Sequence, residues 1–275
     1  MIAALVPNVD RGLHCRTMES TQPPPRAPRA RRWAKRSLLA LLGLLSLLVV
    51  GGVALHQPRP TGTPGPAAEA LAQRVELAVG RAQWDQTGAV AWTLFGHRHL
   101  WDRQRGFVQV TYRDMRVLLR TADQSGVAFD DGQALRGPEL RAALDKAWAY
   151  FCNDSFWLNP IVKVFDPGTT RSIVRVDGRD ALLVEYSTGG VTPGDAYLWI
   201  LGDDDLPTAW RMWVSVLPVG GIRVPWAGYV TLSTGAKVAT EHRYGAVGFR
   251  VEDLRAAAQL SELVGAADPF TPLTR

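Results

Sequence analysis

The sequence predicts a mainly β (α+β) protein: an antiparallel meander forming a half-barrel with covering helices, preceded by one N-terminal transmembrane helix. Three observations predict it. Residues 37–55 carry no charge. Short runs in which apolar and polar residues alternate, as they do in strands, fill most of residues 88–251. Three other stretches, 67–79, 138–153 and 254–264, have the spacing of amphipathic helices.

The uncharged run from Ser37 to Leu55 reads SLLALLGLLSLLVVGGVAL. A helix needs ~20 such residues to cross the hydrocarbon core of a bilayer. Six cations and no acid lie between Arg26 and Arg36, and positive charge stays on the cytoplasmic side. We therefore expect a basic cytoplasmic tail at 1–36, a transmembrane helix at 37–55 and an extracytoplasmic remainder. The expected location is the inner (cytoplasmic) membrane of a bacterium, crossed once with the N-terminus in the cytoplasm.

Two alternatives to a retained anchor stay open. Small residues at Gly52 and Ala54 would suit cleavage of a signal peptide, although the apolar run exceeds the usual ~7–15 residues. Translation from Met18 would shorten the charged region before that run. A buried core helix is disfavoured, because it would carry polar residues on one side and this run has only Ser37 and Ser46.

The charge of the chain is divided unevenly. The net charge of +5 comes from residues 1–55, which carry +6, whereas residues 56–275 carry −1. Membrane topology explains this basic tail, so we expect no nucleic-acid partner. The two cysteines, Cys15 and Cys152, would lie on opposite sides of the membrane and could not pair, and Cys152 is expected to pack as a small apolar residue.

Residues 56–68, HQPRPTGTPGPAA, are rich in proline and glycine and predict an extended linker off the membrane. The remaining residues, 69–275, are enough for one extracytoplasmic β-rich domain. Runs in which apolar residues recur at every second position, separated by turns, predict about ten strands, with a hairpin turn at Asp177-Gly178. The apolar, proline-broken segment 155–170 is expected to cap the core.

Nine of the ten tryptophans fall after the linker, several beside large aliphatic residues on one strand face. An aromatic-rich closed core would explain them. A half-open sheet with an apolar concave face would instead make a hydrophobic ligand cavity. The candidate lining residues of that cavity are Trp92, Leu94, Trp148, Trp157, Trp199, Trp210 and Met212.

Histidines provide the remaining candidate chemistry. His97 and His99 share one strand face, with Asp102 nearby and His242 elsewhere in the chain. Zinc sites use such a spacing but need a third and fourth ligand, and the sequence does not place them, so we expect no metal and no other cofactor. No catalytic residues are predicted; an enzyme is disfavoured, and a hydrolase using the His97/His99 region is the weakest alternative.

The segments 88–92 (GAVAW), 100–102 (LWD) and 210–214 (WRMWV) resemble the LolA/LolB-like lipoprotein-carrier fold. Segments 151–160 (FCNDSFWLNP) and 164–171 (VFDPGTTR) are similar to an uncharacterised group of bacterial membrane-anchored proteins. The resemblance covers residues 70–255 and implies a cavity that shelters acyl chains. We therefore expect a membrane-anchored domain that binds a lipid or lipoprotein acyl chain. A structural envelope protein without a ligand is the main alternative.

Overall fold

The computed structural model describes residues 29–188, 192–244 and 247–274. The chain divides into two units, 1–50 and 51–275, which are treated separately below. Most of the expected cytoplasmic tail, together with Cys15 and Met18, lies outside the described residues.

The first unit contains most of helix α1 (Arg29–Leu55), which begins eight residues before the expected apolar span. Leucines such as Leu39 and Leu41 on this helix are exposed, at 68% and 62% of their surface. No helix in the described part of the chain combines the length and the apolar character that crossing a membrane requires.

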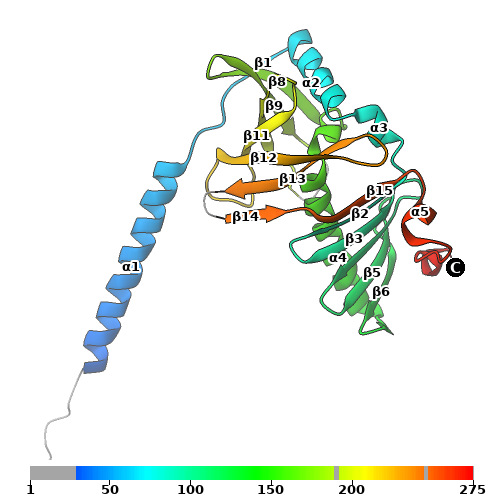
Figure 1. Cartoon of the computed structure of the whole chain (residues 1–275). Helices are drawn as coiled ribbons and strands as arrows, with labels where there is room; N and C mark the ends of the chain where they lie inside the picture. The colour runs from blue at the N-terminus through cyan, green and yellow to red at the C-terminus, as the bar shows by residue number, and fades with distance from the viewer. Residues whose placement is uncertain (1–28, 189–191, 245–246, 275) are drawn as a thin grey trace, which may run out of the picture. The chain divides into compact units, whose positions relative to one another are not determined.

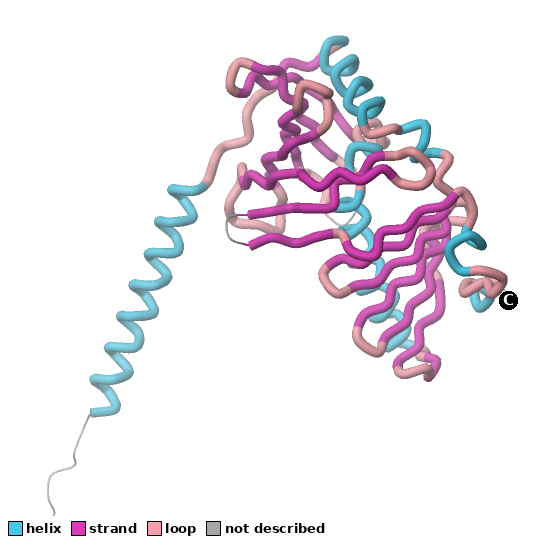
Figure 2. The backbone as a smooth tube through the Cα atoms, viewed as in Figure 1, coloured by secondary structure: helices cyan, strands magenta, loops and turns pink. Residues whose placement is uncertain are grey.

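The second unit is built on two open antiparallel sheets rather than the single meander expected (Figures 1 and 2). The seven-stranded sheet has the order β15-β2-β3-β4-β5-β6-β7. Its strands are β2 (Ala89–Leu94), β3 (His97–Asp102), β4 (Phe107–Tyr112), β5 (Met115–Arg120), β6 (Gly126–Asp130), β7 (Gln133–Ala134) and β15 (Glu252–Ala257).

The second sheet has eight strands in the order β1-β8-β9-β10-β11-β12-β13-β14. They are β1 (Thr63–Pro64), β8 (Thr169–Val176), β9 (Arg179–Tyr186), β10 (Ala196–Leu201), β11 (Pro207–Trp213), β12 (Ile222–Thr231), β13 (Lys237–Tyr244) and β14 (Val247–Arg250). The hairpin predicted at Asp177-Gly178 joins β8 to β9, and both turn residues have positive φ (49° and 79°), as a two-residue hairpin turn requires.

The helices of this unit are α2 (Pro66–Ala78), α3 (Arg81–Asp85), α4 (Gly137–Leu158) and α5 (Leu260–Val264), with 3-10 turns η1 (Pro160–Lys163) and η2 (Thr271–Leu273). Helix α4 lies along one face of the seven-stranded sheet, against β4, β5 and β6 (Figure 1). It carries Phe151 into the core of that sheet, and Phe156 and Trp157 into the core of the other. One helix therefore contributes side chains to the cores of both sheets.

Two expectations about the secondary structure are wrong. Residues 254–257 were expected to begin a terminal helix, but they belong to β15, which pairs with β2 about 160 residues earlier in the chain. Ala256 and Ala257 are thereby buried, and long-range pairing overrides the local helical pattern. The helix expected to end at Asn153 runs on to Leu158, so only the second part of the 155–170 segment is irregular.

The eight-stranded sheet buries its aromatic residues against α2, η1 and the end of α4. Trp210 is completely buried, with ring centroids 4.7 Å from Trp157 and 4.9 Å from both Trp199 and Trp226. These contacts make Trp210 the centre of this core.

We expect Trp210→Ala to lower the free energy of unfolding by about 3–5 kcal/mol, because the lost contacts leave a cavity that rigid neighbouring rings cannot fill. Met212→Ala, at a half-buried position on the same face, should cost clearly less. Urea denaturation of both variants measures the difference. Equal effects would contradict the placement of Trp210 at the core centre.

Candidate functional site

The seven residues expected to line a ligand cavity lie in two separate packed clusters. Trp92 and Leu94 belong to the core of the seven-stranded sheet, with Trp148 packed against it. Trp199 and Trp210 belong to the core of the eight-stranded sheet, with Met212 packed against it, and Trp157 contacts both cores. Four of the seven (Trp92, Leu94, Trp199 and Trp210) are at most 1% exposed.

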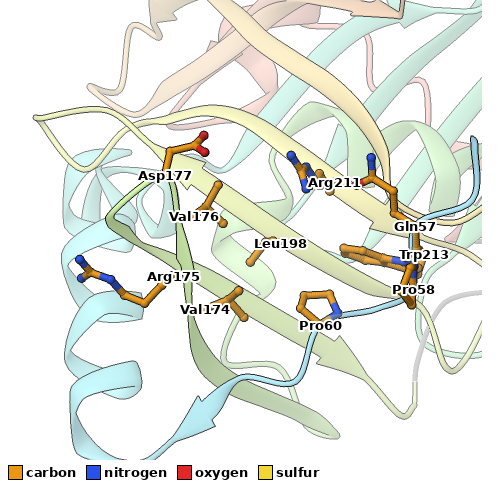
Figure 3. Close-up of a pocket in the computed structure, with 10 residues that line it drawn as sticks. All are labelled: Gln57, Pro58, Pro60, Val174, Arg175, Val176, Asp177, Leu198, Arg211 and Trp213. Atoms are coloured by element: carbon orange, nitrogen blue, oxygen red, sulfur yellow. Dashed lines mark hydrogen bonds between the residues drawn. The ribbon is translucent and has the colours of Figure 1, made fainter.

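A groove with an apolar floor and a polar rim lies instead on the other face of the eight-stranded sheet, between the sheet and the linker (Figure 3). Its volume is about 290 Å³. Alternate residues of β8, β10 and β11 form its floor: Val174, Val176, Leu198 and Trp213. Pro58 and Pro60 of the linker form the facing wall.

The linker is held on the sheet by specific contacts. The indole Nε1 of Trp213 donates a hydrogen bond to the carbonyl of Gln57 (2.7 Å), and the amide of Gln57 donates to the carbonyl of Gly220 (3.0 Å). Gly221 has a φ of +79°, and a Cβ there would lie 2.5 Å from Cβ of Gln57, so glycine is needed at this crossing. Thr63-Pro64 then pairs with β8 as a short edge strand. The segment expected to be an extended linker off the membrane is partly docked on the sheet.

The rim of the groove carries two arginines and one acid. Arg175 pairs with Asp180 through a 2.7 Å contact. Arg211 donates to the side-chain oxygen of Gln57 (3.1 Å), and no carboxylate of the described residues pairs with it. Asp177 lies at the hairpin end of the groove. Half-buried Arg211 therefore offers a positive charge beside an apolar floor.

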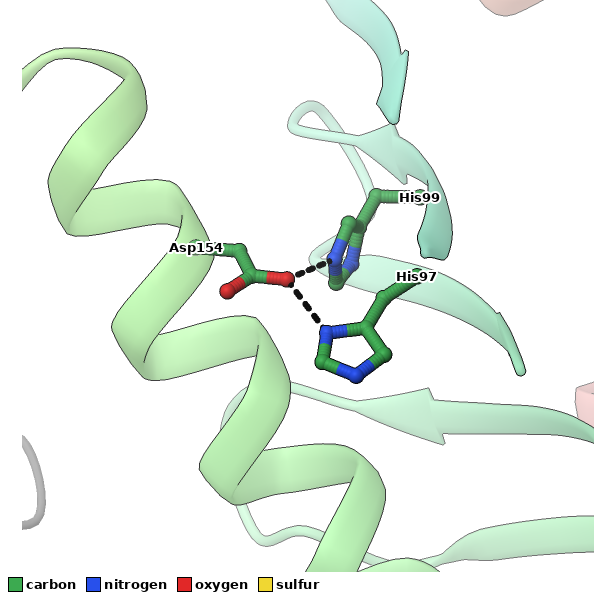
Figure 4. A group of neighbouring side chains, drawn as sticks. All are labelled: His97, His99 and Asp154. Atoms are coloured by element: carbon green, nitrogen blue, oxygen red, sulfur yellow. Dashed lines mark hydrogen bonds and ion pairs between the residues drawn. The ribbon is translucent and has the colours of Figure 1, made fainter. Parts of the chain in front are cut away.

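His97 and His99 of β3 meet Asp154 of α4 (Figure 4). Alternation along the strand places both imidazoles on one face, and α4 crosses that face. Oδ2 of Asp154 lies 2.9 Å from Nδ1 of His97 and 2.7 Å from Nε2 of His99. An ionised carboxylate only accepts hydrogen bonds, so both ring nitrogens donate to it. Asn153 donates to the other carboxylate oxygen, at 2.8 Å.

Burial and aromatic stacking fix this cluster. The side chains of His99 and Asp154 are fully buried, and that of His97 is 16% exposed. Trp92 stacks on His99 with ring centroids 4.5 Å apart, and Tyr150 stacks on His97 at 3.6 Å. Burial lowers the pKa of His99, so its imidazole stays neutral and its Nδ1, which has no hydrogen-bond partner in the structure, carries no proton.

The other candidate residues lie elsewhere. Asp102 belongs to the far end of β3, where it pairs with Arg105 at 2.5 Å. His242 packs among Trp157, Trp226 and Phe249, so the histidines do not form one cleft. Cys152 is half-buried, and burial raises the pKa of its thiol to about 11, which keeps it protonated and unreactive at neutral pH.

The sequence did not place Asp154 beside His97 and His99, and it did not indicate the groove. Asp154 follows Cys152-Asn153 in a helix whose apolar spacing was clear, and an acid on the apolar side of a helix was the available signal. The groove residues Val174, Val176 and Leu198 lie on strands that were correctly expected. Their face became a site only because the linker folds back over it.

Comparisons with known proteins give little further identification. No family model matches the chain, and no curated protein matches it. A DUF1329 family protein from Desulfovibrio piger, known from its crystal structure, is similar in part. It shares 13% sequence identity with a TM-score of 0.39, over 76% of this chain and 97% of that one.

The buried His242 makes stability depend on pH. Burial lowers its pKa to about 4, whereas an unfolded histidine has a pKa of about 6.5. Between these values the unfolded state binds more protons, so stability falls as the pH falls through this window. The loss approaches about 3 kcal/mol near pH 4.

We expect His242→Phe, which keeps the aromatic packing, to flatten the decline in the free energy of unfolding between pH 6.5 and 4. The exposed His56→Gln should keep the slope of the parent. Urea denaturation at a series of pH values measures both. Identical slopes for the parent and His242→Phe would show that His242 does not titrate in this way.

Proposed function

We propose that this chain is a single-pass protein of the bacterial inner membrane whose extracytoplasmic β-rich domain binds a hydrophobic ligand, such as a lipid or lipoprotein acyl chain. The groove beneath the linker is the observation that carries the binding proposal. Its floor is apolar, it is open to solvent, and the facing wall is a linker instead of a packed element of the core.

The dimensions and charge of the groove favour the binding of one part of an amphiphilic molecule. Its volume of about 290 Å³ lies at the lower end of the ~300–1,000 Å³ typical of ligand pockets. Burying a CH₂ group in such a groove contributes about 0.8 kcal/mol. Arg211 at the rim is not paired with a carboxylate among the described residues and offers its positive charge to an anionic head group. The occupant we propose is therefore a segment of acyl chain that carries a negatively charged end.

The groove replaces the cavity that we first expected around the tryptophans. Because Trp92 and Leu94 are packed in one core and Trp199 and Trp210 in the other, they support the structural alternative, in which the faces that carry them are closed cores. Trp148, Trp157 and Met212 keep partial exposure, but none of the seven lines the groove. A hydrolase is the less favoured alternative, since only His97 of the histidine cluster can meet a substrate.

Membrane anchoring is a separate part of the proposal and rests on the sequence. Nineteen uncharged residues follow six cations, and this order predicts a cytoplasmic N-terminus. An anchor of this kind would hold the groove near a bilayer surface, where acyl chains are found.

We expect a reporter that is active only outside the cytoplasm to be active when fused after residue 66. The same reporter fused after residue 28, before the apolar run, should be inactive and serves as the control. Activity of a cytoplasm-only reporter at residue 66 would refute the orientation. Intact-mass analysis separates a retained anchor from a signal peptide cleaved near residue 55.

For the groove, we expect the purified protein to bind the apolar dye N-phenyl-1-naphthylamine, and Val174→Glu to weaken binding at least tenfold. The half-buried position of Val174 lets the new carboxylate reach water, so the fold should persist, and circular dichroism checks this. Val230→Glu is the matched control, because Val230 lies on the same sheet, is 41% exposed and is outside the groove.

Arg211→Gln should leave dye binding unchanged and weaken binding of dodecanoate several-fold, since only the fatty acid carries a negative charge. Equal dye binding by Val174→Glu and Val230→Glu would exclude the groove as the site. Absence of binding by the parent would favour the structural alternative.

A further inference from the structure

The cluster of His97, His99 and Asp154 is distinct from the groove and lies against the other sheet. Nδ1 of His97, Nε2 of His99 and a carboxylate oxygen of Asp154 all lie within 4.8 Å of one another. The two histidines come from one strand and the acid from the helix that crosses it, so the fold supplies the third side chain that the sequence alone did not place (Figure 4).

The charge of Asp154 is poorly balanced. Its side chain is completely buried, and an ionised carboxylate out of water is costly unless a positive charge accompanies it. In the described ranges the only basic side chains in contact with it are the two histidines, and His99 is neutral. The nearby ammonium of Lys146 lies instead over the rings of Tyr112 and Tyr150, at 5.4 and 5.7 Å.

We propose that His97, His99 and Asp154 bind a divalent transition-metal ion, with Zn²⁺ as the best match. Two imidazole nitrogens and one carboxylate oxygen are a donor set that zinc uses in sites with an open coordination position. The ion supplies the positive charge that the buried carboxylate lacks. Of the three ligands only His97 keeps partial exposure, at 16%, so water or an external ligand would reach the ion from its side.

Small movements of the three side chains would convert the hydrogen-bonded cluster into a metal site. The nitrogens now lie 2.7 and 2.9 Å from the carboxylate oxygen, joined by hydrogen bonds. Metal bonds of about 2.0–2.1 Å at tetrahedral angles place such atoms about 3.3 Å apart. As each nitrogen binds the ion, its proton passes through solvent to the other nitrogen of the same ring, so both imidazoles stay neutral. The stacked rings of Trp92 and Tyr150 hold the imidazole planes in place, so the ligands are largely preorganised.

Calorimetric titration of the chelator-treated full chain with ZnCl₂, and with CoCl₂ as a coloured probe, tests the proposal. We expect one ion per chain and visible absorption bands of Co²⁺ bound to nitrogen and oxygen. Asp154→Asn, which keeps the size of the side chain, should weaken binding at least tenfold. His97→Phe, which keeps the stacking on Tyr150, should do the same.

Controls address the other metal-binding side chains. His56→Gln and Cys152→Ser should bind as the parent does. Absence of binding at 100 µM metal would overturn the proposal, and so would full binding by His97→Phe, because the ion would then lie elsewhere. If Asp154→Asn fails to fold by circular dichroism, His97→Phe at its partly exposed position decides the question.

Discussion

The placement of helix α4 is the constraint on which the rest of the second unit depends. One helix packs against the seven-stranded sheet along most of its length and then delivers Phe156 and Trp157 to the core of the eight-stranded sheet. Its position along β3 is fixed by the buried carboxylate of Asp154, because directional hydrogen bonds to His97 and His99 are satisfied at only one register.

The two cores are filled by large rings, and this determines where a ligand can bind. Trp92 and His99 are stacked in one core, while Trp199, Trp210 and Trp226 contact one another in the other. Such interiors are close-packed and leave no room for a guest. Accessible apolar surface lies on the opposite face of the eight-stranded sheet, where Val174, Val176 and Trp213 remain half-buried beneath the linker.

The linker has two structural roles. Its prolines suit an extended path and remove backbone donors that would otherwise need partners, while Gln57 and Thr63 attach it to the sheet. Because a segment attached at a few points separates from a sheet more easily than a core helix does, the groove has a wall that can adjust to an occupant. The groove and the histidine cluster lie on different sheets, so binding at either can be altered without touching the other.

The sequence by itself determined the β-rich class, most strand positions, the hairpin at Asp177-Gly178 and the existence of α2 and α4. These features depend on the alternation of apolar residues in strands, on turn-forming residues and on the spacing of apolar residues in helices, all of which are local properties of the sequence. The tertiary structure decided that the strands divide into two sheets, that residues 252–257 pair with β2 and not with a neighbour, and that Asp154 joins His97 and His99. It also decided that the tryptophans fill cores while the linker covers the groove. These outcomes depend on contacts between residues far apart in the chain. A local pattern indicates which face of a strand is apolar, but it does not indicate which element will cover that face.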